Sequence, residues 1–252
     1  MNYIKVSKRH LIYELKTVLA NFYIPFFGMI FPMILAIFIS NSVAKQVPAQ
    51  FALEAKTNVI LNIMPMIGLS SLYLGEAAIF TLEVEKQITQ RLEVFGFNKV
   101  RIVLAKYYSL LIFLVVSTAL YLLVTYFFAG FKIPKVSGFI LVNLLMIIMG
   151  SIMFLIAHSI SLIIKFFSAS YGISMVVYFS IMFLSGIMGL KPEDMPSVFR
   201  AISKLIPYSY IDVFYNIWIG KSTHIYGFLQ ALILFIGIAG VLFLIGLKKK
   251  WY

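Results

Sequence analysis

Two short patterns contain residue types that could do chemistry. Ser185 and His158 could supply the nucleophile and base of an intramembrane serine protease, but nothing in their spacing supports such a pair. The Gly-Lys-Ser triplet that ends at Ser222 is like the end of a phosphate-binding loop, yet that motif needs a glycine where this sequence has Tyr215. HExxH, GxSxG and zinc-ligand patterns are lacking as well. We therefore predict no catalytic residue and no metal ligand.

Polar side chains within apolar runs are the other candidates for function. Glu76 is the one acid that could lie at membrane depth, where an ionisable group suggests function. It could equally be an interfacial carboxylate that pairs with Lys86 or with an N-terminal base. His158 could be a buried, hydrogen-bonded histidine or a proton relay. The candidate pathway or interface residues are Asn62, Ser70, Glu76, Ser185 and Gly186.

The composition shows what must position these residues. With 62% hydrophobic and 12% charged residues among 252, and a mean hydropathy of +0.99, the chain cannot be a soluble domain. Runs of about 20 apolar residues, the length that spans a bilayer, are uninterrupted rather than alternating, which favours helices over a barrel. These runs are Phe22–Ser40, Val59–Phe80, Ile102–Gly130, Gly138–Ile164, Phe167–Leu190 and Tyr226–Leu247. We predict an all-α integral membrane protein, with residues 1–252 forming one transmembrane domain.

The distribution of charge predicts the orientation. Six crossings place both termini on one side, and that side carries 13 of the Lys and Arg residues against 8 on the other. The positive-inside rule therefore places both termini in the cytosol, in a multi-pass protein of the cell membrane. A nucleic-acid partner is not expected, because the net charge of +12 is divided among short loops. The absence of cysteine excludes disulfides.

The N-terminal segment 3–20 has the pattern of an amphipathic surface helix. Ile4, Leu11, Leu15 and Val18 share one face, while Lys5, Arg9, Glu14 and Lys16 lie elsewhere. We expect this helix to lie flat on the inner surface of the membrane lipid, although it could instead continue the first span. The first span should be kinked at Pro32, and Asn41–Thr57 should form a short polar loop.

Two further connections are informative. In 81–101, Val84, Ile88, Leu92 and Phe95 fit one side of a cytosolic helix whose other side is charged. In 191–222, Asp194 with Pro196 after it is a plausible helix start, and Ser197–Ile206 then has an apolar face. Pro207 separates this piece from an aromatic segment, Tyr208–Ile219. Both pieces are too short to cross, so they predict a re-entrant or interfacial helical hairpin at the outer boundary. The final KKKWY should anchor the inner face.

Two stretches resemble the permeases of type 2 ABC exporters, and the similarity extends over essentially the whole chain. The first resembles the family's cytosolic loop at Glu85, Lys86, Ile88, Arg91, Leu92, Gly96 and Lys106. The second resembles its signature around the fifth span and outer hairpin at Leu184, Ser185, Gly186, Pro192, Met195, Pro196, Leu205, Pro207, Tyr208 and Asp212. One departure is Gln87, where many members of the family have a glycine.

The resemblance implies a permease that dimerises with a second copy or a paralogue and has no ATPase of its own. ATP and Mg would be bound by two separate nucleotide-binding subunits, which would dock on the helix after the second span, and the N-terminal helix would complete the socket. The residues assigned to docking are Glu83, Glu85, Lys86, Arg91 and Glu93, and those assigned to the outer hairpin are Pro192, Pro196, Pro207, Tyr208 and Asp212.

The scarcity of charge within the spans favours a hydrophobic or amphipathic cargo such as a peptide, toxin or drug. Its path would lie at the dimer interface, along the second and fifth spans. An alternative is a permease for lipid-linked polysaccharide or cell-wall polymer, since the outer aromatic residues are compatible with a wide channel. An alternative from a different functional class is a membrane anchor or immunity protein that transports nothing.

Overall fold

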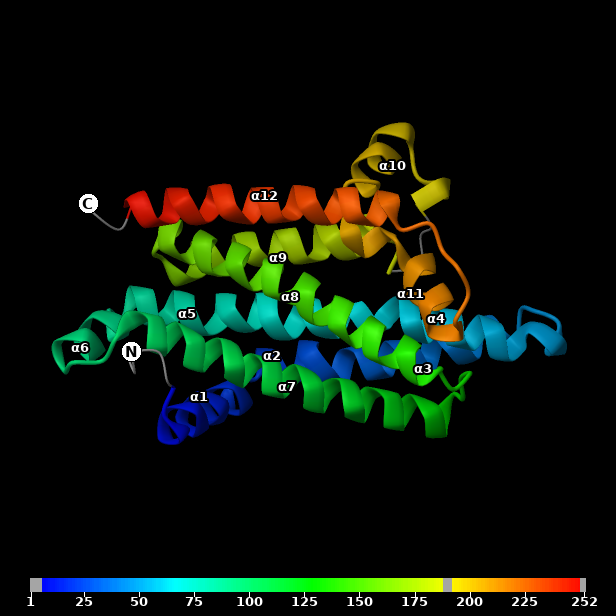
Figure 1. Ribbon diagram of the computed structural model, residues 1–252, viewed down its shortest axis with the longest axis horizontal. Helices are drawn as coiled ribbons and strands as arrows, with labels where there is room; N and C mark the ends of the chain where they lie inside the picture. Colours follow the sequence, from blue (N-terminus) through cyan, green and yellow to red (C-terminus); the bar gives the residue numbers. More distant parts are fainter. Residues whose placement is uncertain (1–5, 188–191, 250–252) are drawn as a thin grey trace.

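The computed structural model describes residues 6–187 and 192–249, and these residues are helical with no strand (Figure 1). Within them, six segments are long and apolar enough to cross a membrane. They are Tyr23–Ala44, Ala49–Glu85, Lys99–Phe128, Val136–Ile164, Phe167–Leu184 and Tyr226–Lys249. The predicted all-α membrane fold with six crossings is confirmed. Leu190, Lys191 and the end of KKKWY, like Ile4 and Lys5, lie outside the described residues.

The second crossing is the centre of the bundle. It consists of α4 (Ala52–Gly68), the π-helical segment η3 (Leu69–Leu74) and α5 (Gly75–Glu85), with the 3-10 turn η2 (Ala49–Phe51) in front. Its apolar stretch is fully buried, whereas those of the other five crossings are 17 to 39% buried. Since α3, α7, α8 and α9 all contact it, its small and polar side chains face other helices of the same chain.

The remaining crossings surround this centre. The first comprises α2 (Tyr23–Pro25), the π-helical segment η1 (Phe26–Ile30) and α3 (Phe31–Ala44), and the others are α7 (Lys99–Phe128), α8 (Val136–Ile164), α9 (Phe167–Leu184) and α12 (Tyr226–Lys249). Helix α8 packs closely because Gly150 faces η3: a Cβ added there would lie 2.5 Å from Leu72 Cδ1 and 3.3 Å from the Gly68 carbonyl. Small residues permit such approaches between membrane helices.

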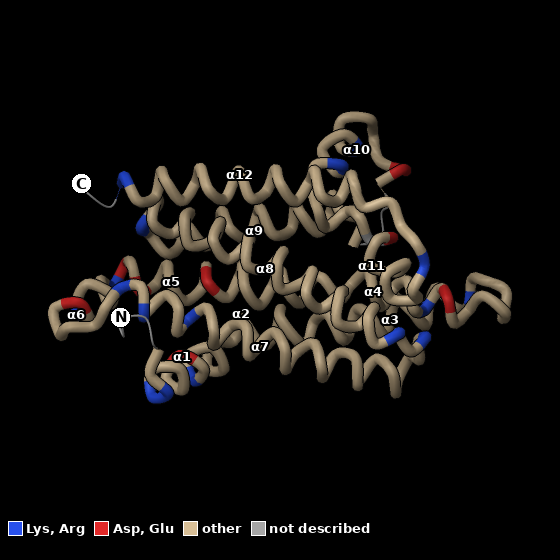
Figure 2. Tube along the Cα trace, in the orientation of Figure 1, with Lys and Arg blue, Asp and Glu red and all other residues tan. Residues whose placement is uncertain are grey.

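The two ends of the bundle differ. At one, which we call the α6 end, lie α1 (Lys8–Ala20), α6 (Ile88–Val94) and the last turn of α12. At the other, the α11 end, lie η4 (Pro192–Asp194), α10 (Ser197–Ser203), η5 (Pro207–Ser209) and α11 (Ile211–Ile219) (Figure 1). Charged positions gather at both ends (Figure 2), as expected where helices leave a membrane.

Three sequence predictions about helix ends are wrong. The polar loop predicted at Asn41–Thr57 is mostly helical, because α3 continues to Ala44 and η2 begins at Ala49. Hydropathy predicts only the part of a helix that lies in lipid. These helices extend beyond that part, because backbone hydrogen bonding continues into the polar residues. The predicted helix start at Asp194 is also wrong, since that residue belongs to η4 and α10 begins at Ser197. Finally, α10 ends at Ser203 rather than Ile206.

The single helix predicted in 81–101 is divided. Helix α5 ends at Glu85, Gln87 has a left-handed backbone with φ of 55°, and α6 covers only Ile88–Val94 before Gly96, with φ of 84°, turns the chain towards α7. The apolar face expected from Val84 to Phe95 is therefore shared between two helices. The left-handed turn at Gln87 explains why a glycine suits this position, because glycine adopts positive φ without a steric penalty.

At the N-terminal side, α1 is a separate helix. Ser7 caps it by accepting a hydrogen bond from the His10 amide, 3.2 Å away, and Asn21 ends it with an extended backbone. The alternative that this segment simply continues the first span is therefore wrong. The π-helical segment η1 ends at Ile30, and Pro32 lies in the first turn of α3, the helix that follows. A wide π-helical turn accommodates a residue that lacks a backbone N–H.

Candidate functional site

The residues predicted to dock a partner lie at the α6 end, on the end of α5 and on α6. Glu83, Glu85 and Glu93 line one cavity of about 330 Å³, together with Thr89 and Lys165. Each acid is held differently. Glu83 forms an ion pair with Lys106, Glu85 accepts a hydrogen bond of 2.5 Å from the Phe167 amide, and Glu93 lies 2.6 Å from Lys99 Nζ.

The other predicted docking residues are exposed outside this cavity. Lys86 lies in the turn before α6, and Arg91 lies on α6 itself. Beyond them, Val94 is 86% exposed and Phe95 is 79% exposed at the C-terminal end of α6. Apolar side chains this exposed, surrounded by charge and outside the apolar part of the bundle, are typical of a protein interface.

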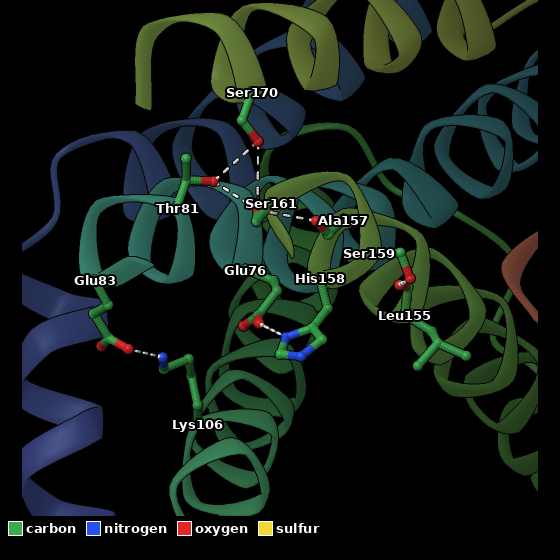
Figure 3. Close-up of polar contacts among 10 residues, drawn as sticks. All are labelled: Glu76, Thr81, Glu83, Lys106, Leu155, Ala157, His158, Ser159, Ser161 and Ser170. Atoms are coloured by element: carbon green, nitrogen blue, oxygen red, sulfur yellow. Dashed lines mark hydrogen bonds and ion pairs between the residues drawn. The ribbon is translucent and has the colours of Figure 1, made fainter. Parts of the chain in front are cut away.

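Two charged side chains, Glu76 and Lys106, are buried beside this surface, and Figure 3 shows their partners. Glu76 Oε1 lies 2.7 Å from His158 Nδ1, and Glu76 is fully buried. The expectation that Glu76 pairs with Lys86 or an N-terminal base at the interface is therefore wrong. The reading of His158 as a buried, hydrogen-bonded histidine is confirmed. Lys106, also fully buried, pairs with Glu83 and lies 5.0 Å from the centre of the Phe80 ring.

Hydroxyl groups join the central crossing to its neighbours. Thr81 Oγ1 lies 2.6 Å from Ser161 Oγ and 3.3 Å from Ser170 Oγ, which connects α5 to α8 and α9 (Figure 3). Further along, Ser70 Oγ and Tyr178 OH share a hydrogen bond of 2.8 Å. In this conformation Ser70 and Glu76, both predicted for a pathway or interface, are enclosed by the chain's own helices. Their role in a pathway stays a prediction.

A second group of predicted residues meets at the α11 end. Asn62, Gly186, Pro192 and Asp212 line a cavity of about 680 Å³, whose lining also includes Arg200, Lys204 and His224. The structure thus brings two of the pathway residues to two residues of the outer hairpin. Ser185 does not join them, because its hydroxyl donates to the Ile181 carbonyl of α9. Nor does it meet His158, which bonds to Glu76.

The rest of the outer segment is held by aromatic side chains. Trp218 is buried and donates from Nε1 to the Lys132 carbonyl, 2.8 Å away, which fixes α11 against the connection before α8. Tyr208 is buried as well, and burial raises the pKa of its hydroxyl. Pro207 is buried at the start of η5, and Pro196 directly precedes α10. These residues shape the segment rather than line the cavity.

Sequence reasoning missed a buried acid on α1. Glu14, assigned to the polar side, is 2% exposed and faces the bundle together with Val18. Burial raises the pKa of Glu14 to about 7, although Lys106 opposes the shift. His10 Nε2 lies 3.3 Å from Glu14 Oε1, and burial lowers the pKa of His10. Glu14 lies three residues after Leu11 and four before Val18, so the three residues share one face of a helix. This spacing could have predicted that Glu14 is buried.

The fold and these surfaces define a multi-pass helical membrane protein whose central helix leads into a short charged helix outside the apolar region. The profile of the ABC-2 type transporter family matches residues 10–212. The match covers most of the chain, so the protein belongs to that family, whose members are the membrane components of ABC transporters and associate with ABC ATPase subunits. No curated protein matches the chain.

Proposed function

We propose that this chain is the permease subunit of an ATP-driven exporter, and that it moves a hydrophobic or amphipathic cargo outward across the cell membrane. The observation that carries the proposal is the continuity between the central crossing and α6. Force applied to α6 reaches α5 through a two-residue turn, and α5 belongs to the one crossing that the other helices enclose. A displacement at this point would therefore move the core of the bundle.

In this account two ATPase subunits dock on α6 from the cytosol, and a second copy or a paralogue completes the permease. The exposed Val94 and Phe95 would form the apolar part of the interface, with Arg91 of α6 and Glu85 at the end of α5 as charged contacts. ATP and Mg would be bound in the partner. The cavity at the α11 end, which Asn62 and Gly186 line, is a candidate outer opening of the path.

Charge reversal on α6 and in the turn before it tests the docking. Arg91→Glu and Lys86→Glu change exposed side chains. Glu83 and Glu85 stay unchanged, because their reversal would leave the buried Lys106 or the Phe167 amide without its partner. We expect each exposed variant to lower co-purification of the ATPase at least tenfold while the permease keeps its elution profile. Lys221→Glu, an equivalent reversal at the α11 end, is the control. Unchanged co-purification by both variants would place the docking surface elsewhere.

The cargo is tested separately, in the reconstituted complex. Hydrophobic peptides should stimulate ATP hydrolysis, because the crossings offer apolar walls and few fixed charges. Stimulation by a lipid-linked glycan, with no response to such peptides, would replace this cargo class by the polysaccharide alternative and leave the docking proposal intact.

A further inference from the structure

A cavity of about 620 Å³ lies between α1 and the end of α5, beside α6. This volume is within the range of small-molecule sites. Its lining includes five apolar side chains, Ile79, Leu82, Ile88, Leu92 and Phe97. Two acids, Glu14 and Glu83, also line it, as do His10 and the exposed Arg9. The wall formed by α5 and α6 is therefore apolar except for Glu83, whereas the wall formed by α1 and its two ends is polar and also includes Ser7, Tyr13, Thr17 and Asn21.

Glu14 is the side chain in this wall that lacks a full set of partners. Its Oε1 faces His10 Nε2, but its Oε2 is buried and has no hydrogen-bond partner among the described residues. A buried acceptor without a donor is costly, and the cost is larger for an ionised group. Glu14 thus has an unpaired, buried acceptor, and the same side chain lines a cavity that could hold a donor.

The surrounding charges do not neutralise Glu14. Lys106 from α7 is the nearby buried cation, and it is bonded to Glu83 of α5. Glu76, also of α5, adds a further negative charge close enough to act on Glu14. His10 contributes no charge near neutral pH, because burial and Lys106 lower its pKa. Acids therefore outnumber the fixed buried cation in this region.

We propose that this cavity binds an amphiphilic cation, whose ammonium pairs with the carboxylate of Glu14 in the cavity wall while its apolar body packs against Ile79 and Leu82. An anionic amphiphile would meet Glu14 and Glu83, and a neutral apolar molecule would offer the Glu14 carboxylate no donor. The ligand would lie between α1 and α6 and join the two helices. Such binding to the chain alone requires neither the ATPase nor a particular cargo.

The test uses a matched pair of compounds, 1-adamantylamine and 1-adamantanol, which share an apolar cage and differ in the ammonium group. Calorimetric titration of the chain in lipid nanodiscs at pH 8, with empty discs subtracted, gives both affinities. We expect the amine to bind at least tenfold more tightly than the alcohol. We also expect Glu14→Gln to lose at least tenfold in amine affinity, whereas Glu54→Gln, the same change at the α11 end, loses none.

A second variant and a second pH test the proposal independently of how Glu14→Gln folds. Leu82→Trp fills the cavity from the opposite wall without a change of charge, so it should abolish amine binding even if Glu14→Gln does not fold. At pH 5.5 the wild type should bind the amine more weakly, since Glu14, whose pKa burial raises to about 7, is then protonated, and Glu14→Gln should show a smaller loss. Equal affinity for amine and alcohol, amine affinity retained in folded Glu14→Gln, or amine binding retained in Leu82→Trp would overturn the proposal.

Discussion

At the scale of single residues, the turn before α6 depends on the backbone of Gln87. Its φ of 55° is left-handed, a conformation that costs a non-glycine residue about 1 to 2 kcal/mol. We predict that Gln87→Gly stabilises the chain by about 0.5 to 1 kcal/mol in thermal unfolding followed by light scattering. Gln90→Gly, inside α6, is the control and should destabilise it by about 1 kcal/mol. Destabilisation by both variants would contradict the assigned turn.

Glu14 should make stability depend on pH. The folded state raises its pKa from 4.5 to about 7, so the folded protein binds this proton more tightly than the unfolded chain does. Stability contributed by the protonated form is therefore complete below pH 4.5 and is lost as the pH rises to 7. We predict that the free energy of unfolding of the wild type falls between pH 5 and pH 8 by roughly 1 to 3 kcal/mol more than that of Glu14→Gln. Identical pH profiles for wild type and variant would contradict the burial of an ionisable group here.

At the scale of elements, the approach of α11 to α8 depends on Gly138. A Cβ added there would lie 2.5 Å from the Ile217 carbonyl and 2.9 Å from that of Trp218. We predict that Gly138→Ala destabilises the protein by about 1 to 3 kcal/mol, because backbone must shift to admit the methyl group. Gly237→Ala on α12, where nothing lies within 4 Å, should be neutral or stabilising. Equal effects in thermal unfolding would show that α11 does not pack as described.

The same scale shows what the sequence could predict. The crossings were predictable because lipid requires long apolar helices, and the structure moves their ends rather than their number. The break at Gln87 was not predictable, since the spacing of the apolar residues fits one long helix as well as it fits two helices with a turn between them. Glu14 and the pairing of Glu76 with His158 were missed because a carboxyl group is assigned to water unless its partner on a distant helix is known. The meeting of Asn62 and Asp212 at one cavity was not predicted, because the sequence pattern does not show how the outer segment lies over a distant helix.

At the scale of the whole molecule, we predict that the α6 end faces the cytosol and the α11 end faces the outside. The chain has no native cysteine, so single cysteines can be introduced without background. In intact cells, a membrane-impermeant maleimide should label Thr223→Cys, at the α11 end, and leave Gln90→Cys on α6 unlabelled. After permeabilisation both should react. Labelling of Gln90→Cys in intact cells would reverse the orientation and remove α6 from the reach of any cytosolic ATPase.

The central claim is that α6 is the contact through which an ATPase acts on this chain. The most direct measurement places a photo-crosslinking amino acid at Phe95, 79% exposed beside α6, or at Tyr226, 76% exposed at the start of α12 near the α11 end. We predict that, in cell membranes, Phe95 crosslinks to a polypeptide that binds ATP and that Tyr226 does not. A crosslink to such a polypeptide from Tyr226, or none from Phe95 in a complex that still hydrolyses ATP, would contradict the account.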